Sequence, residues 1–186
     1  MQVAIYGGSF DPPHISHLLT VHYLLAIGAA DLVLVVPVFQ HAFEKKLSPF
    51  ASRLAMCRAA FDPVEFVEVS EIESTLPVPN YTLNTILALR QEYPEASFRL
   101  VVGADVLADA GHWHRFDELC ELAPPLVLGR AGVDDPRAPP AVLPAVSSSQ
   151  AREWFKASAG REAARLQETL IPRAVREVIE REQLYR

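Results

Sequence analysis

The sequence predicts an α/β protein with a Rossmann-like parallel sheet that is flanked by helices on both faces. Two observations lead to this prediction. Short apolar runs alternate with stretches of helical spacing along the chain, and a glycine turn follows the first apolar run. Strands joined through helices of this length pair in parallel through right-handed crossovers. In such folds ligands bind at the carboxyl ends of the strands, which is where the glycine turn is expected to lie.

The expected strands are apolar runs of four to six residues. They comprise residues 3–6, 32–37, 64–69, 98–102 and 125–128, with a further short strand at 142–146. The longest apolar run, 32–39, has the length of a strand and is far shorter than the roughly 20 residues that span a membrane.

Helices are expected between these strands and after the last of them. The spacing of apolar residues predicts helices over residues 17–28, 49–61, 82–92, roughly 114–121 and 172–182. Pro172 suits the first turn of the last helix, and Arg152 is expected at the start of another. Residues 132–144 are rich in Pro and Gly and predict a surface loop. Residues 1–186 are therefore interpreted as a single domain with a small helical C-terminal part from about residue 148.

Composition narrows the class of protein. With 186 residues the chain can bury a core without disulfides, and its formal net charge of −6 argues against a broad nucleic-acid surface. Cys57 and Cys120 have no metal-type spacing and are expected to be buried thiols in a reducing cytoplasm. The N-terminus shows no pattern of a signal peptide, so we expect a cytoplasmic protein without membrane contact. The sequence leaves the oligomeric state open, a homo-oligomer included.

The most informative segment is Gly7-Gly8-Ser9-Phe10-Asp11-Pro12-Pro13-His14-Ile15-Ser16-His17, which connects the first strand to the first helix. The two glycines allow the backbone to approach a phosphate closely, and a helix N-terminus supplies unpaired amides and a partial positive charge. His14 and His17 are three residues apart and would face the same bound group on one helical turn. Phosphate contact is favoured over a metal pair or simple helix capping, because no third metal ligand with suitable spacing is evident.

This segment resembles the signature of the nucleotidylyltransferase superfamily, and later segments make the resemblance more specific. In order and spacing they look like bacterial nicotinate-nucleotide adenylyltransferase, over essentially the full chain. The segments are Val36-Pro37, residues 50–56, Asn80-Tyr81-Thr82-Leu83-Asn84-Thr85, Val102-Gly103-Ala104-Asp105, Trp113, residues 146–152 with Ser147, Ser148 and Arg152, Leu170-Ile171-Pro172 and Leu184-Tyr185.

Three positions depart from the pattern of that family. Ser16 replaces a glycine, and Asn84 stands where an aspartate is common. The loop after the second strand reads His41-Ala42-Phe43-Glu44-Lys45-Lys46 instead of Pro-Pro-His-Lys, and it is about two residues shorter before Arg53. These differences leave open which lysine acts and affect what can be expected of substrate choice.

The resemblance implies transfer of the adenylyl group of ATP to nicotinate mononucleotide, with Mg²⁺ carried by ATP rather than held in a protein metal site. Its implied catalytic residues are His14, His17, Arg152, Lys45 and Lys46. The implied ATP-binding residues are Gly7, Gly8, Ser9, Phe10, Gly103, Asp105, Ser147 and Ser148, with Asp105 on a ribose hydroxyl. Tyr81, Thr82 and Trp113 are implied to bind the pyridine nucleotide, Trp113 by stacking on the ring.

Plainer interpretations exist for several of these residues. Asp105 could cap a helix, Lys45 and Lys46 could be solvated loop residues, and Arg152 could be a charge on a helix face. His112 and His114 are expected to be exposed loop residues. For the whole protein, the alternatives are nicotinamide mononucleotide or another phosphorylated acceptor as substrate, or a non-catalytic nucleotide-binding protein.

Overall fold

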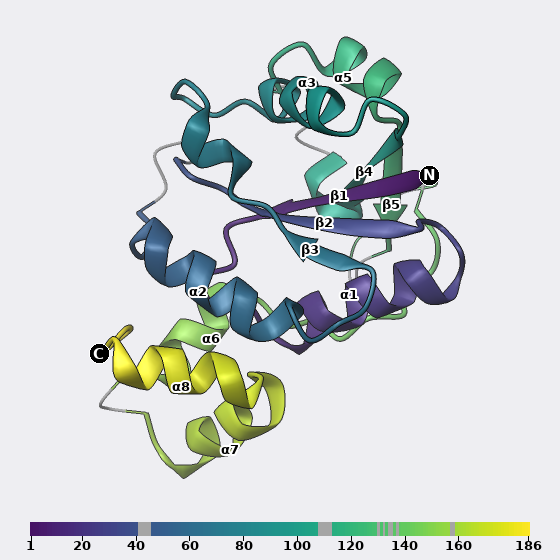
Figure 1. Ribbon diagram of the computed structural model, residues 1–186. Coiled ribbons are helices and arrows are strands. Elements are labelled where there is room, and N and C mark those ends of the chain that lie inside the picture. The colour runs from purple at the N-terminus through teal and green to yellow at the C-terminus, as the bar shows by residue number, and fades with distance from the viewer. Residues whose placement is uncertain are drawn as a thin grey trace.

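A computed structural model describes residues 1–40, 46–107, 113–129, 131, 133, 136, 138–156 and 159–186. Its centre is a parallel sheet with the strand order β3-β2-β1-β4-β5 (Figure 1). The strands are β1 (Gln2–Gly8), β2 (Leu32–Pro37), β3 (Val67–Val69), β4 (Ser97–Gly103) and β5 (Pro125–Leu128). The predicted Rossmann-like sheet is confirmed.

Helices cover both faces of the sheet, as Figure 1 shows. On one face lie α1 (Ile15–Ala26) and α2 (Phe50–Phe61), and on the other α3 (Thr82–Glu92) and α5 (Phe116–Leu122). The period-two alternation of the strands explains this: Ala4 and Val33 belong to the core on the α1 and α2 side, whereas Val3 and Leu34 belong to the core under α3 and α5. Every residue of β2 is buried, in accord with a strand covered on both faces.

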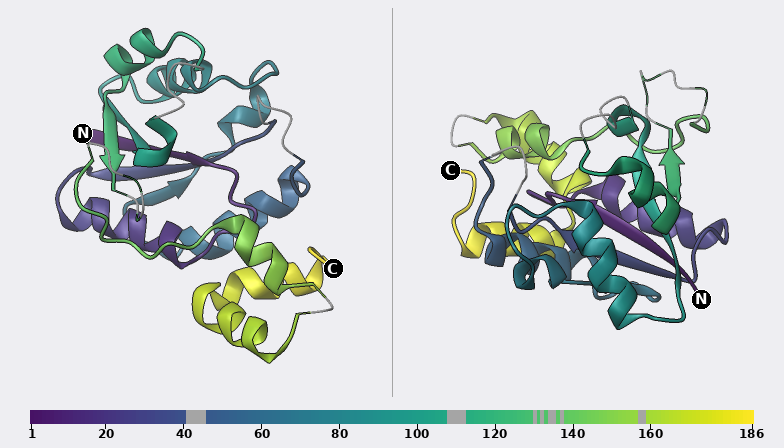
Figure 2. Two further views of the ribbon diagram at one scale, coloured as in Figure 1. Left: turned by 180° about the vertical axis from the view of Figure 1, so that it is seen from behind. Right: turned by 90° about the horizontal axis from the view of Figure 1, so that it is seen from above.

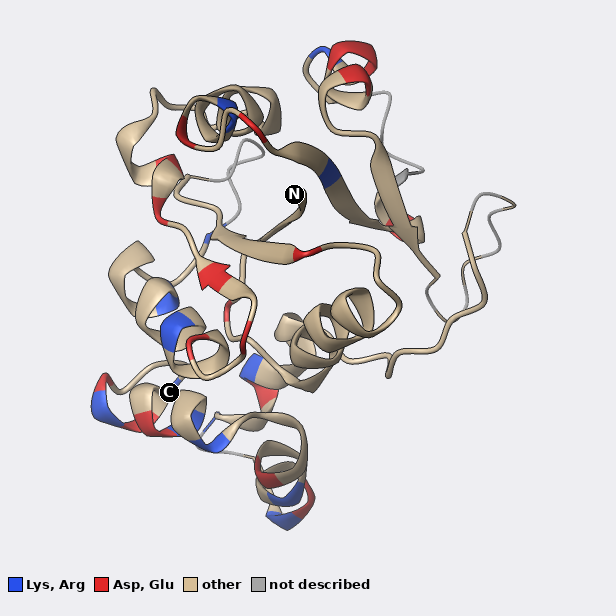
Figure 3. Cartoon of the chain, turned by 45° about the vertical axis from the view of Figure 1, so that its right-hand side comes forward, with Lys and Arg blue, Asp and Glu red and all other residues tan. Residues whose placement is uncertain are grey.

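The C-terminal part is helical. It contains α6 (Ser148–Trp154), α7 (Arg161–Leu170) and α8 (Arg173–Arg181), and α8 packs on α2 on the side away from the sheet (Figure 2). Figure 3 shows charged residues spread over these helices and α2, whereas α1 carries none. None of the helices in the described ranges is long and apolar enough to cross a membrane.

Some expected boundaries differ from those observed. β3 begins at Val67 rather than at residue 64, because residues 62–66 turn and Phe66 has a left-handed backbone (φ 60°). The strand predicted at 142–146 is wrong: these residues form no ladder, and Pro144 in their middle has no amide hydrogen to donate. The sequence also gave no signal for the short helices η1 (Ile72–Thr75) and α4 (Ala104–Leu107).

The sheet opens between its central strand, β1, and the neighbouring β4. β1 pairs with β2 as far as Gly8 and Pro37, but its pairing with β4 ends at Ile5 and Leu100. Beyond that point β1 and β4 diverge toward their carboxyl ends. The strand order reverses direction here, and this is where ligands bind in open parallel sheets.

Candidate active site

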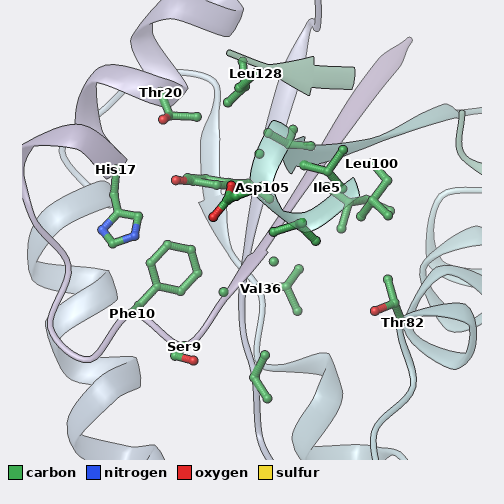
Figure 4. A pocket seen from close by; sticks show the side chains of 18 of the residues that line it. Ile5, Ser9, Phe10, His17, Thr20, Val36, Thr82, Leu100, Asp105 and Leu128 are labelled. Carbon is green, nitrogen blue, oxygen red and sulfur yellow. The ribbon is translucent and has the colours of Figure 1, made fainter. Parts of the chain in front are cut away.

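A crevice of about 940 Å³ occupies the opening between β1 and β4. Its lining includes most of the residues that the sequence implied as nucleotide ligands. They are Gly7, Gly8, Ser9, Phe10, His14, His17, Tyr81, Thr82, Gly103, Asp105, Trp113, Ser147 and Ser148. In Figure 4, His17 and Phe10 lie on one side of the crevice, Thr82 lies on the opposite side, and Asp105 lies between them. The crevice therefore has two ends, formed by different parts of the chain.

The first end, which we call the phosphate end, consists of residues 7–17. His14 occupies the N-cap position of α1, and its backbone amide donates to Nδ1 of His17 at 3.1 Å. The two imidazoles stack with ring centroids 3.7 Å apart. Because Nδ1 of His17 accepts this bond, the ring hydrogen of the neutral tautomer resides on Nε2. His17 thus accepts a capping hydrogen bond through Nδ1 and keeps a ring donor on Nε2. Helix capping and phosphate contact are therefore compatible interpretations of the two histidines.

Phe10 packs against the ring of His17. Its side chain is buried, and its ring centroid lies 4.9 Å from that of His17 and 5.4 Å from that of Tyr6. Its backbone is left-handed (φ 46°), which is uncommon for an aromatic residue and is found at sites where the surroundings fix the chain. Phe10 lines the crevice, but this packing makes it a support for His17.

Two arginines hold the phosphate end from outside the crevice. Arg53 on α2 is 1% exposed, and its guanidinium donates to the carbonyls of Ser48 (3.0 Å), Ser9 (3.0 Å) and Phe39 (3.4 Å). Burial lowers the pKa of Arg53, and Asp11 acts in the opposite direction. The fixed fork of five N–H donors explains why a guanidinium serves here, since it satisfies three carbonyls at once.

Arg152 lies in the last turn of α6 rather than at the start of a helix as expected. It donates through Nη1 to the carbonyl of Asp11 at 2.7 Å and through Nη2 to Oγ of Ser149 at 3.2 Å. It is not among the residues that line the crevice. Arg152 is nevertheless more than a charge on a helix face, because its guanidinium contacts the backbone of residues 7–17 at Asp11.

The serines before Arg152 cap and attach α6. Ser147 is the N-cap of α6 and accepts from the amide of Gln150 at 3.2 Å. The hydroxyl of Ser148 donates to the carbonyl of Pro12 at 2.9 Å. Both line the crevice, although these hydroxyls already make bonds within the protein.

The second end, which we call the pyridine end, is made of Asn80–Thr82 and Trp113–His114. His114 is exposed and lies in a turn, as expected. It also lines the crevice, and its ring stacks on that of Tyr81 with centroids 4.5 Å apart. Trp113 is half-buried and meets Phe116 edge to face at 6.1 Å. Aromatic faces are thus available at this end for a planar ring.

A buried carboxylate holds the pyridine end together. Glu73 on η1 accepts from the amide of Phe39 at 2.9 Å and from the Thr85 hydroxyl at 3.0 Å. The Asn80 side chain donates to the Glu73 carbonyl at 2.9 Å and accepts from the Gln40 amide at 3.1 Å. Burial raises the pKa of Glu73. Sequence reasoning missed Glu73, because it is a lone acidic residue in a turn segment without periodicity.

Asp105 lies between the two ends. It belongs to the first turn of α4, directly after β4, and so it is not the helix N-cap that was considered. Gly103 at the end of β4 leaves room for this carboxylate, since a Cβ on residue 103 would collide with Oδ1 of Asp105.

The remaining candidates lie elsewhere. Lys46 is exposed and does not line the crevice, and His41, Lys45 and His112 lie outside the described residues. Ser16, the departure from the family pattern, lines the crevice and donates its hydroxyl to the Pro144 carbonyl at 2.8 Å. Cys57 is a buried free thiol whose pKa is raised by burial, whereas the free thiol of Cys120 is only partly buried.

Comparisons with known proteins agree with this geometry. The cytidylyltransferase-like family matches residues 5–154. A protein of Anaeromyxobacter dehalogenans strain 2CP-C, named probable nicotinate-nucleotide adenylyltransferase, is 38% identical over all of this chain and 97% of its own length. The chain belongs to the nicotinate-nucleotide adenylyltransferase family. A relative of the same name from Myxococcus xanthus strain DK1622 is 36% identical over 82% of this chain and 81% of its own.

Solved structures of nicotinate-nucleotide adenylyltransferases share the fold. That of Plasmodium falciparum nicotinic acid mononucleotide adenylyltransferase complexed with NaAD aligns with a TM-score of 0.81 at 20% identity, over 99% of this chain and 97% of that one. A putative nicotinate-nucleotide adenylyltransferase from Vibrio parahaemolyticus aligns with a TM-score of 0.71 at 18% identity, over 100% and 95%. The nucleotidylyltransferase type of the predicted fold is thereby confirmed.

Proposed function

We propose that this protein transfers the adenylyl group of ATP to nicotinate mononucleotide, forming deamido-NAD and pyrophosphate. The observation that carries the proposal is the crevice between β1 and β4, with a phosphate-type end and an aromatic end in a chain of this family. We also place the reaction in the cytoplasm, where pyridine nucleotides are made.

Adenylyl transfer mainly requires that the two substrates be aligned. A phosphate oxygen of the mononucleotide attacks the α-phosphorus of ATP, the bond from that phosphorus to the bridging oxygen breaks, and pyrophosphate leaves with the electron pair. Because the attacking oxygen is already an anion, no general base is needed. Catalysis then rests on holding the two phosphates in line and on stabilising the charge of the leaving group.

The phosphate end supplies groups for that task. The backbone of Gly7–Ser9, the N-terminus of α1 and the Nε2–H of His17 lie along one wall of the crevice. His14 stacks on His17 and shares the site. Arg152, which donates to the Asp11 carbonyl, is proposed to add positive charge near the phosphates. Ser147 and Ser148, which line the crevice, are proposed to contact the ATP. Lys45 and Lys46 are proposed to approach the phosphates from the loop after β2.

The pyridine end suits the nicotinate ring. Trp113 and Tyr81 offer aromatic faces, and the first turn of α3 begins at Thr82. Amides of a first helical turn have no partner within the helix, and the positive end of the helix dipole favours an anion. A ring carboxylate gains from this environment more than a neutral amide does. Asp105, which lines the crevice between the two ends, is proposed to accept from a ribose hydroxyl.

Mg²⁺ fits this site as part of the ATP substrate. Within the described ranges no cluster of three His, Cys, Asp or Glu side chains could hold a metal ion. Mg²⁺ keeps several waters and is commonly bound through substrate phosphates, where it neutralises the charge of the leaving pyrophosphate.

The test is a chromatographic assay with MgATP and each pyridine mononucleotide in turn. We expect deamido-NAD from the acid at a kcat/KM at least about tenfold above that for the amide, which corresponds to about 1.4 kcal/mol. Faster turnover of the amide would overturn the proposed substrate. ATP binding without pyrophosphate release from any mononucleotide would establish a non-catalytic nucleotide-binding protein instead.

A further inference from the structure

A buried polar cluster lies directly behind the phosphate end. Its centre is the carboxylate of Asp11, which is 1% exposed. Oδ1 accepts from the phenol of Tyr185 at 2.5 Å, and Oδ2 accepts from the amide of Ser48 at 3.1 Å. The Nη1 of Arg152 lies 4.0 Å from Oδ2 and donates to the Asp11 carbonyl. Three distant parts of the chain therefore meet at one residue of the motif.

Asp11 itself is not among the crevice-lining residues, although its neighbours are. Ser9 and Phe10 before it and His14 after it all line the crevice. A buried carboxylate at this position cannot reach substrate phosphates, which would in any case repel it. Its hydrogen bonds instead fix the path of the backbone between Phe10 and His14.

Tyr185 reaches this carboxylate from beyond α8. Its backbone is left-handed (φ 65°), and its hydroxyl also lies 3.8 Å from Sδ of Met56 on α2. Burial and the Asp11 carboxylate raise the pKa of the phenol, so it stays protonated and remains a donor. The α8 helix that precedes it is anchored by Val175, Val178 and Ile179 in the core against α2. A rigid element thus presents this donor.

We propose that Tyr185 is a positioning residue for adenylyl transfer: through its hydrogen bond to Asp11 it holds residues 10–14 in the place where His14 and His17 meet the ATP phosphates. The expected effects on kcat rest on the proposed function, because they are measured on adenylyl transfer. The positioning role gives α8 a task in the site, although none of the described residues after Ser149 lines the crevice.

The experiment compares Tyr185→Phe with Tyr93→Phe. Tyr93 is a matched control, because its phenol also donates to a carboxylate, that of Glu68 at 3.0 Å, but far from the crevice. We expect Tyr185→Phe to lower kcat about tenfold, below the roughly 100-fold that a misplacement of about 1 Å can cost. The KM for nicotinate mononucleotide should change less than about twofold, because the pyridine end is untouched. Tyr93→Phe should leave both values unchanged.

A double-mutant cycle with Asp11→Ala, which removes the acceptor of the Tyr185 hydrogen bond, separates positioning from general destabilisation. If Tyr185 acts through Asp11, Tyr185→Phe costs no further activity in the Asp11→Ala background. Additive losses, or equal effects of Tyr185→Phe and Tyr93→Phe, would overturn the proposal. If Asp11→Ala does not fold, the comparison of the two phenylalanine variants decides alone.

Titration with MgATP distinguishes a failure of the positioning role from a failure of the proposed function. Calorimetry measures the ATP affinity of each variant without any mononucleotide. A wild type that binds ATP but makes no dinucleotide contradicts the proposed function, whereas a several-fold weaker ATP affinity in Tyr185→Phe alone still supports the positioning role. An unchanged ATP affinity and an unchanged kcat in Tyr185→Phe contradict it.

Discussion

The two ends of the crevice are built in opposite ways. The phosphate end is one continuous segment, residues 7–17, and its supports reach it from outside: Arg53, Arg152 and Tyr185. The pyridine end is assembled from separate segments, and the buried Glu73 links the one that begins at Asn80 to residues 39–40 and to α3. Cationic and phenolic donors hold the first end, and a buried acidic side chain that accepts hydrogen bonds holds the second.

This difference has a physical reason. A loop that turns amides toward an anion leaves its carbonyls pointing outward, and those carbonyls need donors such as Arg53. A site for a planar ring needs spaced aromatic faces, and here a carboxyl group that accepts from the Phe39 amide and the Thr85 hydroxyl holds the segment next to Tyr81. Variants at a contact residue and at a supporting residue of each end therefore test the comparison.

The largest effect is expected at the contact residue of the phosphate end. His17→Ala removes the ring donor that we propose for the ATP phosphates and should lower kcat by about 10²–10³, by analogy with the loss of an oxyanion-hole donor. His22→Ala, on the exposed side of the same helix, is the matched control. Steady-state kinetics and a thermal melt of both variants make the comparison. Normal turnover of His17→Ala would remove this residue from the mechanism.

The support of the phosphate end should matter for folding. Arg53→Lys keeps the charge but cannot satisfy three carbonyls, so we expect the free energy of unfolding to fall by about 2–4 kcal/mol. Arg58→Lys, on the same helix but half-exposed, should change it by less than about 0.5 kcal/mol. Urea denaturation measures both values, and similar losses in the two variants would contradict the role assigned to Arg53.

At the pyridine end the contact residue should affect only one substrate. Trp113→Leu removes the aromatic face and should raise the KM for nicotinate mononucleotide about tenfold while leaving that for ATP unchanged. The other tryptophan, Trp154, packs at the C-terminal helices, and Trp154→Leu is the control. A rise in the KM for ATP alone would reverse the assignment of the two ends.

The support of the pyridine end should show itself in the pH dependence of stability. Burial raises the pKa of Glu73 in the folded protein, so its contribution is present at low pH and is lost as the pH rises through that raised pKa. The melting temperature of wild type minus that of Glu73→Gln should therefore fall as the pH rises above the ordinary glutamate pKa of about 4.3. Glu95→Gln, an exposed position, controls for the loss of one charge. A difference that rises with pH would contradict this account.

The same contrast explains what could be predicted from the sequence. The phosphate end could be predicted because its glycines and histidines are neighbours in the chain. Tyr185 and Asp11, by contrast, are 174 positions apart, and Ser9 and Arg53 are 44 apart, so no local pattern reveals their contact. Glu73 could not be predicted either, because it bonds the Phe39 amide 34 positions away and no periodic pattern surrounds it. Apolar Val142 and Val146 suggested a strand, but Pro144 between them cannot donate to a ladder.

The most direct test of the two-ended crevice is a crystal structure with deamido-NAD bound. We expect its phosphates within hydrogen-bonding distance of Nε2 of His17 and its pyridine ring against Trp113, with the ring carboxylate at the first turn of α3. A dinucleotide bound in the reverse direction, or with its ring outside the crevice, would contradict the account.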